Sequence, residues 1–271
     1  MADKRPIGVF DSGLGGLTVV KEMIKQLPNE DIVYFGDTGR VPYGTRSVET
    51  IRKYTLQDEK FLLNNDVKLI VAACGTVSSV ASDTALQLPV PFFEVVSHAS
   101  KSAVNATKNG KIGVIGTNAT VKSEQHKKHI LNFMPKAEVI TVSCPLFVPL
   151  VEEGWYSADD LVVTKTVERY LKPIMDFGAD TLILGCTHYP VLSDAITKIM
   201  GKDVTLINAG TSTASAVKEY LTKNNLQSEK LLANHKFYVS DKPDSFRYQA
   251  SILLGKDIDE TQVQEVDLSS L

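Results

Sequence analysis

Cysteine is scarce in this sequence, which has three among 271 residues, at Cys74, Cys144 and Cys186. A small, odd number of cysteines gives no disulfide framework, and no Cys-x-x-Cys pair is present to suggest a metal site. His126 and His129 are three residues apart and could share a helical face, but they lie among lysines, which is typical of a solvated helix surface. The sequence therefore predicts free thiols and no bound metal.

Long apolar runs and clusters of basic residues are also lacking. No run approaches the roughly 20 apolar residues that a membrane-spanning helix needs, and the N-terminus has no signal-peptide stretch. The net charge is −3, whereas nucleic-acid-binding surfaces gather lysine and arginine. We therefore expect a cytoplasmic protein with no membrane or nucleic-acid partner, and in that compartment cysteines stay reduced.

Motifs for common cofactors are absent as well. Residues 11–16 are rich in glycine, but the dinucleotide-binding pattern Gly-x-Gly-x-x-Gly would require glycine where Thr18 stands. Asp11 would place a negative charge against a pyrophosphate, whereas a positively charged ammonium group would suit it. No P-loop pattern occurs, and no lysine at a strand end stands out as an anchor for pyridoxal phosphate. We therefore expect no cofactor.

Short apolar runs alternate regularly with longer amphipathic stretches. The runs are continuous, which is typical of strands buried on both faces of a parallel sheet. The stretches at 17–27 and 48–64 predict helices. This pattern predicts an α/β doubly wound fold with mainly parallel sheets, and 271 residues suffice for two small domains. The predicted strands cover 7–10, 32–35, 69–73, 112–115, 139–142, 181–184, 204–207 and 237–239.

The two parts of the chain echo each other weakly. Residues 7–12 resemble 112–117, and residues 69–74 resemble 181–186. Each part therefore has a glycine-containing strand followed by a strand that ends in cysteine. We interpret the echo as two related α/β halves, with chance similarity between strand sequences as the alternative.

Domain boundaries follow from where the chain passes between these halves. The segment after Pro91 suggests a crossover near residue 97, and the last predicted strand needs a sheet to join, which suggests a return near residue 210. The sequence therefore predicts a first domain of 1–97 plus 210–271 and a second domain of 98–209.

Polar segments follow several of the predicted strands, at 11–16, 37–44, 74–76 and 186–190. In parallel α/β sheets, ligands bind beyond the carboxyl ends of the strands. A helix that begins there offers N–H groups and a dipole that favour an anion. A carboxylate on a substrate would suit such a place.

Two cysteines end a predicted strand and precede a predicted helix, whose N-terminus is expected to lower the thiol pKa. Two thiols on opposite sides of a carbon acid can remove a proton from one face and return one to the other. Packing is the usual role of a buried cysteine, and we assign it to Cys144, beside Pro145. Cys74 and Cys186 share one context, each with a threonine within two residues, and we predict that both are catalytic.

Three further side chains are predicted to assist these thiols. His188 lies two residues after Cys186 and titrates near neutral pH, so it could help to deprotonate that thiol. Asp11 and Glu152 could pair with a thiol or with the imidazole. A structural role for His188 and a surface role for Glu152 are the alternatives.

These motifs resemble those of the glutamate racemase family. The segment 8–19 is similar to the N-terminal motif of that family, 36–44 to its second motif and 184–190 to the motif around its second cysteine. Segments 145–152 and 246–255 also fit, so the resemblance covers nearly the whole chain. The N-terminal and Cys-Thr-His motifs together make it specific.

The resemblance implies an isomerase that interconverts L- and D-glutamate without a cofactor and supplies D-glutamate for peptidoglycan. It also implies two pseudo-symmetric α/β domains with the active site in the interdomain cleft, and a homodimer. Cys74 would act on D-glutamate and Cys186 on L-glutamate, as the two proton donors and acceptors. The implied substrate contacts are Asp11, Ser12, Pro42, Tyr43, Gly44, Gly75, Thr76, Thr117, Thr120, Thr187 and His188.

One departure from the family bears on the activity. The family usually has Cys-Asn-Thr where this chain has Cys74, Gly75 and Thr76, so a side-chain amide that contacts the substrate is missing. Losing a hydrogen bond to a charged ligand group costs about 1.5–3 kcal/mol, or roughly ten- to a hundredfold in affinity. The alternatives are therefore a racemase of aspartate or another acidic amino acid, and a binding protein with weak activity. Smaller departures are Asn208, where an acidic residue is common, and His126, where tyrosine is common.

Overall fold

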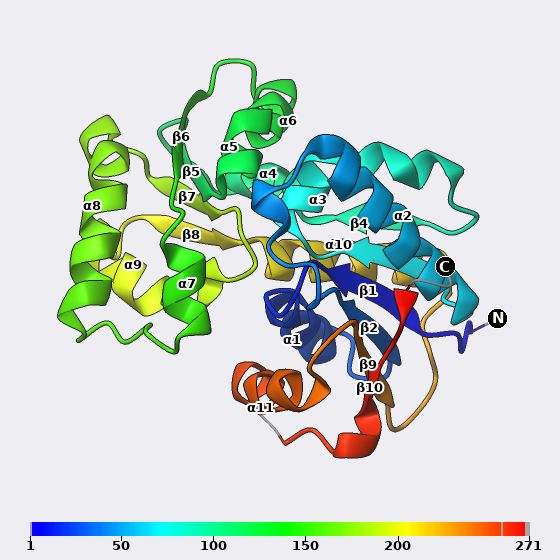
Figure 1. Cartoon of the computed structure of the whole chain (residues 1–271). Coiled ribbons are helices and arrows are strands. Elements are labelled where there is room, and N and C mark those ends of the chain that lie inside the picture. The colour runs from blue at the N-terminus through cyan, green and yellow to red at the C-terminus, as the bar shows by residue number, and fades with distance from the viewer. Residues whose placement is uncertain (1, 256, 269–271) are drawn as a thin grey trace.

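Two parallel β-sheets lie side by side in the computed structural model, which describes residues 2–255 and 257–268 (Figure 1). Within these residues, the larger sheet has the strand order β10-β9-β2-β1-β3-β4 and the smaller has the order β6-β5-β7-β8. We call the larger sheet with its helices the first half and the smaller sheet with its helices the second half. The strands are β1 Ile7–Asp11, β2 Ile32–Gly36, β3 Leu69–Ala72, β4 Phe92–Glu94, β5 Lys111–Gly116, β6 Glu138–Ser143, β7 Thr181–Leu184, β8 Thr205–Asn208, β9 His235–Val239 and β10 Val263–Glu265.

The two sheets repeat one arrangement of strands. In the larger sheet β1 lies between β2 and β3, with β4 beyond β3, and in the smaller sheet β5 lies between β6 and β7, with β8 beyond β7. Strands β9 and β10 extend the larger sheet past β2. The central strands β1 and β5 are the glycine-containing segments of the sequence echo, and β3 and β7 precede Cys74 and Cys186. The predicted α/β class with two pseudo-symmetric, mainly parallel sheets is confirmed.

Every strand predicted from the sequence is present, and the ladders between neighbours are parallel. The sequence analysis missed β4 and β10, which are three residues long each. Runs this short carry no recognisable periodicity. They become strands because β4 pairs with β3 and β10 pairs with β9, so their hydrogen bonds come from neighbours that are distant in the sequence.

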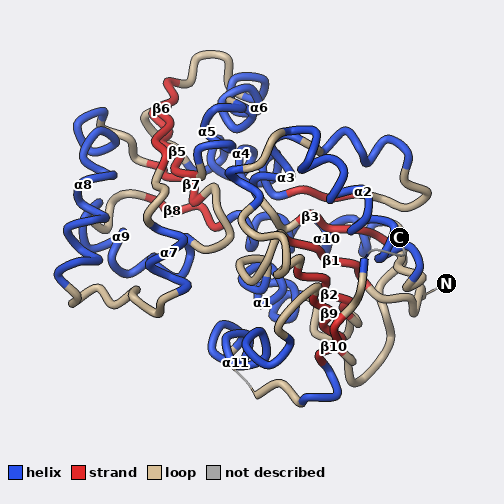
Figure 2. The backbone as a smooth tube through the Cα atoms, in the orientation of Figure 1, coloured by secondary structure: helices blue, strands red, loops and turns tan. Residues whose placement is uncertain are grey.

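Helices surround both sheets (Figure 2). The predicted helices at 17–27 and 48–64 are observed as α1 (Leu17–Gln26) and α2 (Val48–Asn64). Ser47 begins α2 by accepting a hydrogen bond from the Thr50 amide, which satisfies an amide that has no partner inside the helix. No helix in the described part of the chain combines the length and the apolar character needed to cross a membrane. The other helices are α3 Gly75–Val80, α4 Val95–Ala106, α5 Asn118–Ser123, α6 Gln125–Phe133, α7 Phe147–Glu152, α8 Leu161–Phe177, α9 Ser193–Met200, α10 Ala209–Lys223 and α11 Pro243–Leu254, with short 3-10 helices at Tyr43–Thr45, Ser82–Gln87, Tyr189–Leu192 and Glu260–Gln262.

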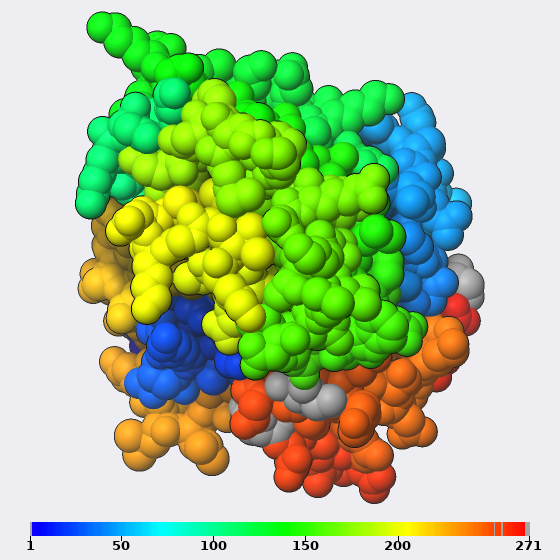
Figure 3. Space-filling model, turned by 90° about the vertical axis from the view of Figure 1, so that its left-hand side faces the viewer, coloured from blue at the N-terminus to red at the C-terminus, as the bar shows by residue number. Residues whose placement is uncertain are grey.

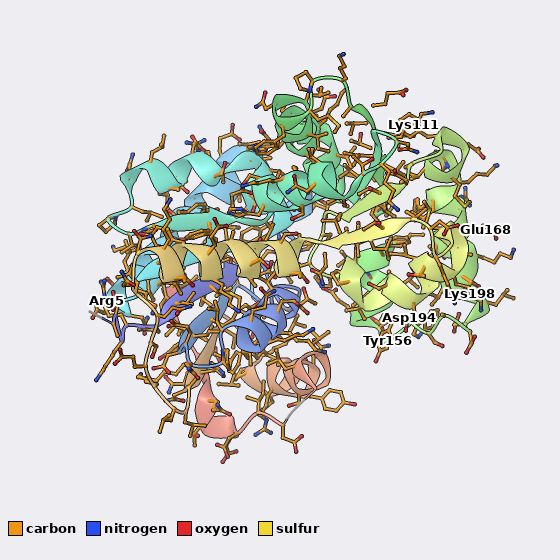
Figure 4. The ribbon with its side chains drawn as sticks, turned by 180° about the vertical axis from the view of Figure 1, so that it is seen from behind. Arg5, Lys111, Tyr156, Glu168, Asp194 and Lys198 are labelled. Atoms are coloured by element: carbon orange, nitrogen blue, oxygen red, sulfur yellow. The ribbon has the colours of Figure 1, made fainter. Side chains whose placement is uncertain are left out.

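Two helices, α4 and α10, join the halves. In Figure 4 α10 continues from β8 and runs across the back of the first half. It packs there against α1 and α4, and α4 packs in turn against α6 and β7 of the second half. One buried hydrophobic cluster accordingly includes Val71 of the larger sheet and Ile183 of the smaller one. Viewed from the left-hand side of Figure 1, the green and yellow second half faces the viewer above the blue and orange parts of the first half (Figure 3).

The prediction of a solvated helix surface at 126–129 was wrong for His126. This residue is 3% exposed, and its Nδ1 lies 3.1 Å from Ser100 Oγ. His126 and the buried Ile130 are four residues apart and therefore share the face of α6 that packs on α4. Burial lowers the pKa of His126 to about 3, so its imidazole is neutral at physiological pH.

Candidate active site

A cavity of about 310 Å³ lies between the two halves. Its walls are the loops and first helical turns that follow β1, β2, β3, β5 and β7, together with the loop and helix α7 that follow β6. These loops lie at the carboxyl ends of parallel strands, where α/β sheets bind their ligands. The lining residues are Ser12, Val41, Pro42, Tyr43, Gly44, Thr45, Cys74, Gly75, Thr76, Thr117, Asn118, Pro145, Val148, Pro149, Glu152, Gly185, Cys186, Thr187, His188 and Tyr189.

Most of the predicted site residues line this cavity, and two lie behind it. Asp11 and Thr120 are 1% and 2% exposed and are covered by lining residues. The sequence analysis missed several lining residues, such as Asn118 and Gly185, whose only signal is that each directly neighbours a predicted residue. The predicted residues in the lining are Ser12, Pro42, Tyr43, Gly44, Cys74, Gly75, Thr76, Thr117, Glu152, Cys186, Thr187 and His188.

Cys74 lies at the N-terminal end of α3, directly after β3. Its thiol donates to Ser12 Oγ over 3.4 Å, and the residue is 4% exposed. The expectation of a lowered pKa for this thiol was wrong, although the Val77 amide in the first turn of the helix does act in that direction. Burial outweighs the helix and, together with the nearby Asp11 carboxylate, raises the pKa of Cys74 to about 12. Cys74 is therefore a neutral thiol near pH 7, which is the form that can donate a proton.

Asp11 lies at the end of β1, beneath the glycine-rich loop. Its Oδ2 accepts a hydrogen bond from the Gly13 amide over 3.1 Å, whereas Oδ1 has no partner among the described residues. Burial raises the pKa of this carboxyl group, and the charge of His188 and the loop amides oppose that rise. The Asp11 charge in turn raises the pKa of Cys74 and of His188, so one carboxylate acts on both halves of the site.

Cys186 lies in a charged cluster with His188 and Glu152. The Cys186 Sγ is 3.9 Å from His188 Nδ1, and His188 Nε2 is 3.2 Å from Glu152 Oε1. Burial alone would lower the pKa of His188, but Cys186, Glu152 and Asp11 together raise it to about 10. The imidazole is therefore a cation near pH 7, and it lies beside the Cys186 sulfur. His188 and Glu152 also line a second cavity, of about 620 Å³, which neither cysteine lines.

Threonine side chains connect the halves around the cavity. The Thr18 hydroxyl of α1 donates to the Thr187 carbonyl over 2.8 Å, which ties the first half to the loop that carries Cys186. The Thr76 and Thr117 hydroxyls lie 3.3 Å apart, and Thr117 lies 3.0 Å from Thr120. Each cysteine loop is therefore tied to the opposite half, the Cys186 loop through Thr18 and the start of α3 through Thr117.

Tyr43 lines the cavity but directs its hydroxyl away from it, into a buried cluster. The hydroxyl donates to Asp37 Oδ2 and lies 3.1 Å from Asp58 Oδ2. Arg40 donates to Asp37 Oδ2 over 2.6 Å and to Asp58 Oδ1 over 3.1 Å. These contacts leave the Tyr43 and Gly44 backbone, rather than the phenol, for contact with a ligand.

Asp58 is a member of this cluster that the sequence analysis missed. It shares the buried stripe of α2 with apolar residues such as Ile51 and Leu62, and a carboxylate at such a position was the available signal. Burial, with the Asp37 carboxylate beside it, raises the pKa of Asp58 well above its ordinary value. The Tyr43 hydroxyl and the Arg40 guanidinium both point their donors at this carboxyl group and oppose that rise.

Comparison with known proteins places the chain in a family. The model of the Asp/Glu/hydantoin racemase family matches residues 7–217. The chain belongs to this family. A glutamate racemase of Geobacter metallireducens is 45% identical over 255 residues, which cover 93% of either chain. The solved structure of a Bacillus anthracis glutamate racemase isoform has a TM-score of 0.92 at 38% identity and covers 97% of this chain and 98% of that one. A Francisella tularensis glutamate racemase, solved in complex with D-glutamate, has a TM-score of 0.91 at 38% identity, with 99% and 100% covered.

As a member of this racemase family the chain is an isomerase, and the resemblance seen in the sequence is confirmed. The three positions at which this chain departs from the usual family motifs lie in different parts of the structure. Asn208 begins α10 by accepting hydrogen bonds from the Gly210 and Thr211 amides, so the position has a structural use here. Gly75 lines the cavity, and His126 is buried behind Gly185.

Proposed function

We propose that this chain interconverts L- and D-glutamate without a cofactor, using Cys74 and Cys186 as the two acid–base groups. The observation that carries the proposal is that one cysteine from each half lines the same cavity. Cys144, by contrast, is fully buried and is not among the lining residues. Two-base racemisation requires a base on one face of the α-carbon and an acid on the other.

The charges around the two thiols bear on the direction of proton transfer. The His188 cation lies beside the Cys186 sulfur, while burial and Asp11 keep Cys74 as a thiol. In the L-to-D direction the deprotonated Cys186 sulfur takes the α-proton of L-glutamate and Cys74 gives its proton to the opposite face, which yields D-glutamate, a Cys74 thiolate and a Cys186 thiol. D-glutamate reacts by the reverse sequence, with Cys74 as the base.

Substrate binding is proposed to rest on hydroxyl and amide groups. The lining contains no lysine or arginine, so the carboxylates of the substrate would be held by Thr76, Thr117 and Thr187 and by backbone amides such as that of Gly44. Asp11, whose Oδ1 has no partner within the described residues, supplies negative charge near the place where the substrate ammonium would lie.

The test uses the purified chain without added cofactor, incubated in deuterated buffer with L-glutamate and separately with D-glutamate. Loss of the α-proton is followed by NMR and loss of optical activity by circular dichroism. Both are expected, and both should be abolished in Cys74→Ser and Cys186→Ser. The matched control is Cys144→Ser, which should stay active because Cys144 lies outside the cavity.

Other outcomes separate the alternatives. Exchange of the α-proton of aspartate but not of glutamate would make the chain an aspartate racemase. Binding of glutamate without exchange would make it a binding protein. Racemisation that survives serine at position 74 or 186 would exclude the two-thiol mechanism.

We further propose a cytoplasmic homodimer whose D-glutamate supplies peptidoglycan. We also propose the domains 1–97 plus 210–271 and 98–209, of which residues 1, 256 and 269–271 lie outside the described residues. Sheet membership supports this division, because β5 to β8 form one sheet and the remaining strands among the described residues form the other.

A further inference from the structure

Gly75 and Gly185 bring the backbones of the two halves into contact beside the cavity. A Cβ atom placed on Gly75 would lie 2.6 Å from the Gly185 carbonyl oxygen, closer than real Cβ atoms approach any neighbour. Gly75 is the first residue of α3 and has no positive φ, so its backbone could accommodate other residues. Glycine is therefore needed here for space and not for conformation.

The Gly185 backbone has little room on its other side. Its amide donates to the Ile115 carbonyl of β5 over 2.7 Å. A Cβ on Gly185 would lie 2.6 Å from that carbonyl oxygen and 3.1 Å from His126 Nε2, and this imidazole is buried beside Ser100. A side chain at position 75 therefore requires a shift of backbone at this contact between the halves.

Both glycines are next to a cysteine, since Gly75 follows Cys74 and Gly185 precedes Cys186. We propose that Gly75 is a positioning residue that lets the halves close far enough to set the separation of the two thiols. The inference rests on the proposed two-thiol reaction. Restoring ordinary contact means increasing the distance from 2.6 Å to 3.4 Å, so a methyl group at position 75 displaces one thiol relative to the other by several tenths of an ångström.

The same contact bears on the amide that the family usually has at this position. The place where a Cβ at position 75 would begin is filled by the Gly185 carbonyl, so Gly75 leaves no empty hole for an asparagine side chain. Asparagine would therefore add an amide and separate the halves at the same time. If the only effect of Gly75 were the loss of a substrate contact, Gly75→Asn would raise activity. If Gly75 sets the separation of the two thiols, Gly75→Asn lowers activity.

The experiment compares the wild-type chain with Gly75→Ala and Gly75→Asn in both reaction directions. Because a misplacement of about 1 Å can cost about a hundredfold, we expect kcat to fall roughly ten- to a hundredfold in both variants, with a smaller change in KM. The primary isotope effect with α-deuterated glutamate should rise, because proton transfer becomes slower relative to the other steps. Thermal unfolding should show a loss of stability of about 1–3 kcal/mol in Gly75→Ala, because the added methyl group overpacks this contact, and the variant should remain folded at the assay temperature.

The matched control is Gly39→Ala. A Cβ there would approach Ser240 Oγ at 3.2 Å and Asp241 Cβ at 3.3 Å, and both neighbours belong to the first half. It therefore adds the same methyl group without separating the halves, and it should keep the wild-type kcat and isotope effect.

Each result bears on a separate claim. Wild-type kcat in Gly75→Ala, or a higher kcat in Gly75→Asn, would overturn the role of Gly75 while leaving the racemase intact. Inactivity of the wild-type chain toward glutamate would overturn the proposed function instead. A crystal structure of Gly75→Ala then tests the contact directly, and an unchanged distance between the residue 75 and residue 185 backbones would refute the inference whatever the activity.

Discussion

His188 is expected to make the stability of this chain fall as the pH rises above neutrality. Burial lowers its pKa, but Cys186, Glu152 and Asp11 raise it, and the net change is from 6.5 to about 10. Between these values the folded chain keeps a proton that the unfolded chain has lost. The stabilisation is therefore fully present below about pH 6.5 and is lost as the pH rises through about 10.

One retained proton changes the free energy of unfolding by about 1.4 kcal/mol per pH unit. Between about pH 7 and about pH 8.5, where the unfolded histidine is mostly neutral, the expected loss is about 2 kcal/mol. Folding also raises the pKa of Cys74. Because an ordinary thiol ionises near pH 9.0, Cys74 adds to the loss of unfolding free energy mainly above that pH.

The assay is urea unfolding at these two pH values for the wild-type chain and for His188→Gln. Glutamine keeps a polar side chain but cannot carry the proton, so the variant should lose most of the difference between the two pH values. An equal fall in both chains would refute the reasoning, because the retained proton would then belong to another group.

Three further changes test the contacts around the site and the core. Thr18→Val removes the hydrogen bond to the Thr187 carbonyl, and kcat should fall with little change in the unfolding midpoint; an unchanged kcat would show that this bond does not position the loop. Lys68→Met leaves the charge of its buried partner Glu30 without a counter-ion, so the free energy of unfolding measured in urea should fall by about 3–5 kcal/mol. A fall of about 1 kcal/mol or less would show that the pair behaves as an exposed one. Folding raises the pKa of Asp58 and so disfavours its charge, and Asp58→Asn keeps the shape of the side chain, so we expect the free energy of unfolding to fall by less than about 1 kcal/mol in this variant, whereas Asp58→Ala should cost about 1–3 kcal/mol by leaving buried partners unsatisfied. Equal losses in Asn and Ala would show that the cluster requires the charge of Asp58.

The tertiary structure added neighbours that the sequence analysis could not supply. Tyr43 lines the cavity, and its predicted contact with the substrate stays a prediction, but its hydroxyl faces Asp37 and Asp58, and Asp58 lies on a helix that follows by many residues. His126 was placed on a solvated face, but it is buried against Ser100. In each case the deciding neighbour comes from another element, and no local pattern reports which elements will pack together.

The amino-acid sequence by itself determined the fold class, the order of most strands, and the position of Cys74 and Cys186 at strand ends. It could do so because continuous apolar runs specify strands buried on both faces, and a loop must follow where each run ends. Only the tertiary structure decided that Cys74 is a neutral thiol beside Asp11, that His188 is a cation, and that Gly75 meets Gly185. Desolvation, Coulomb interaction and steric contact depend on distances between atoms, and those distances exist only once both halves have folded and packed together.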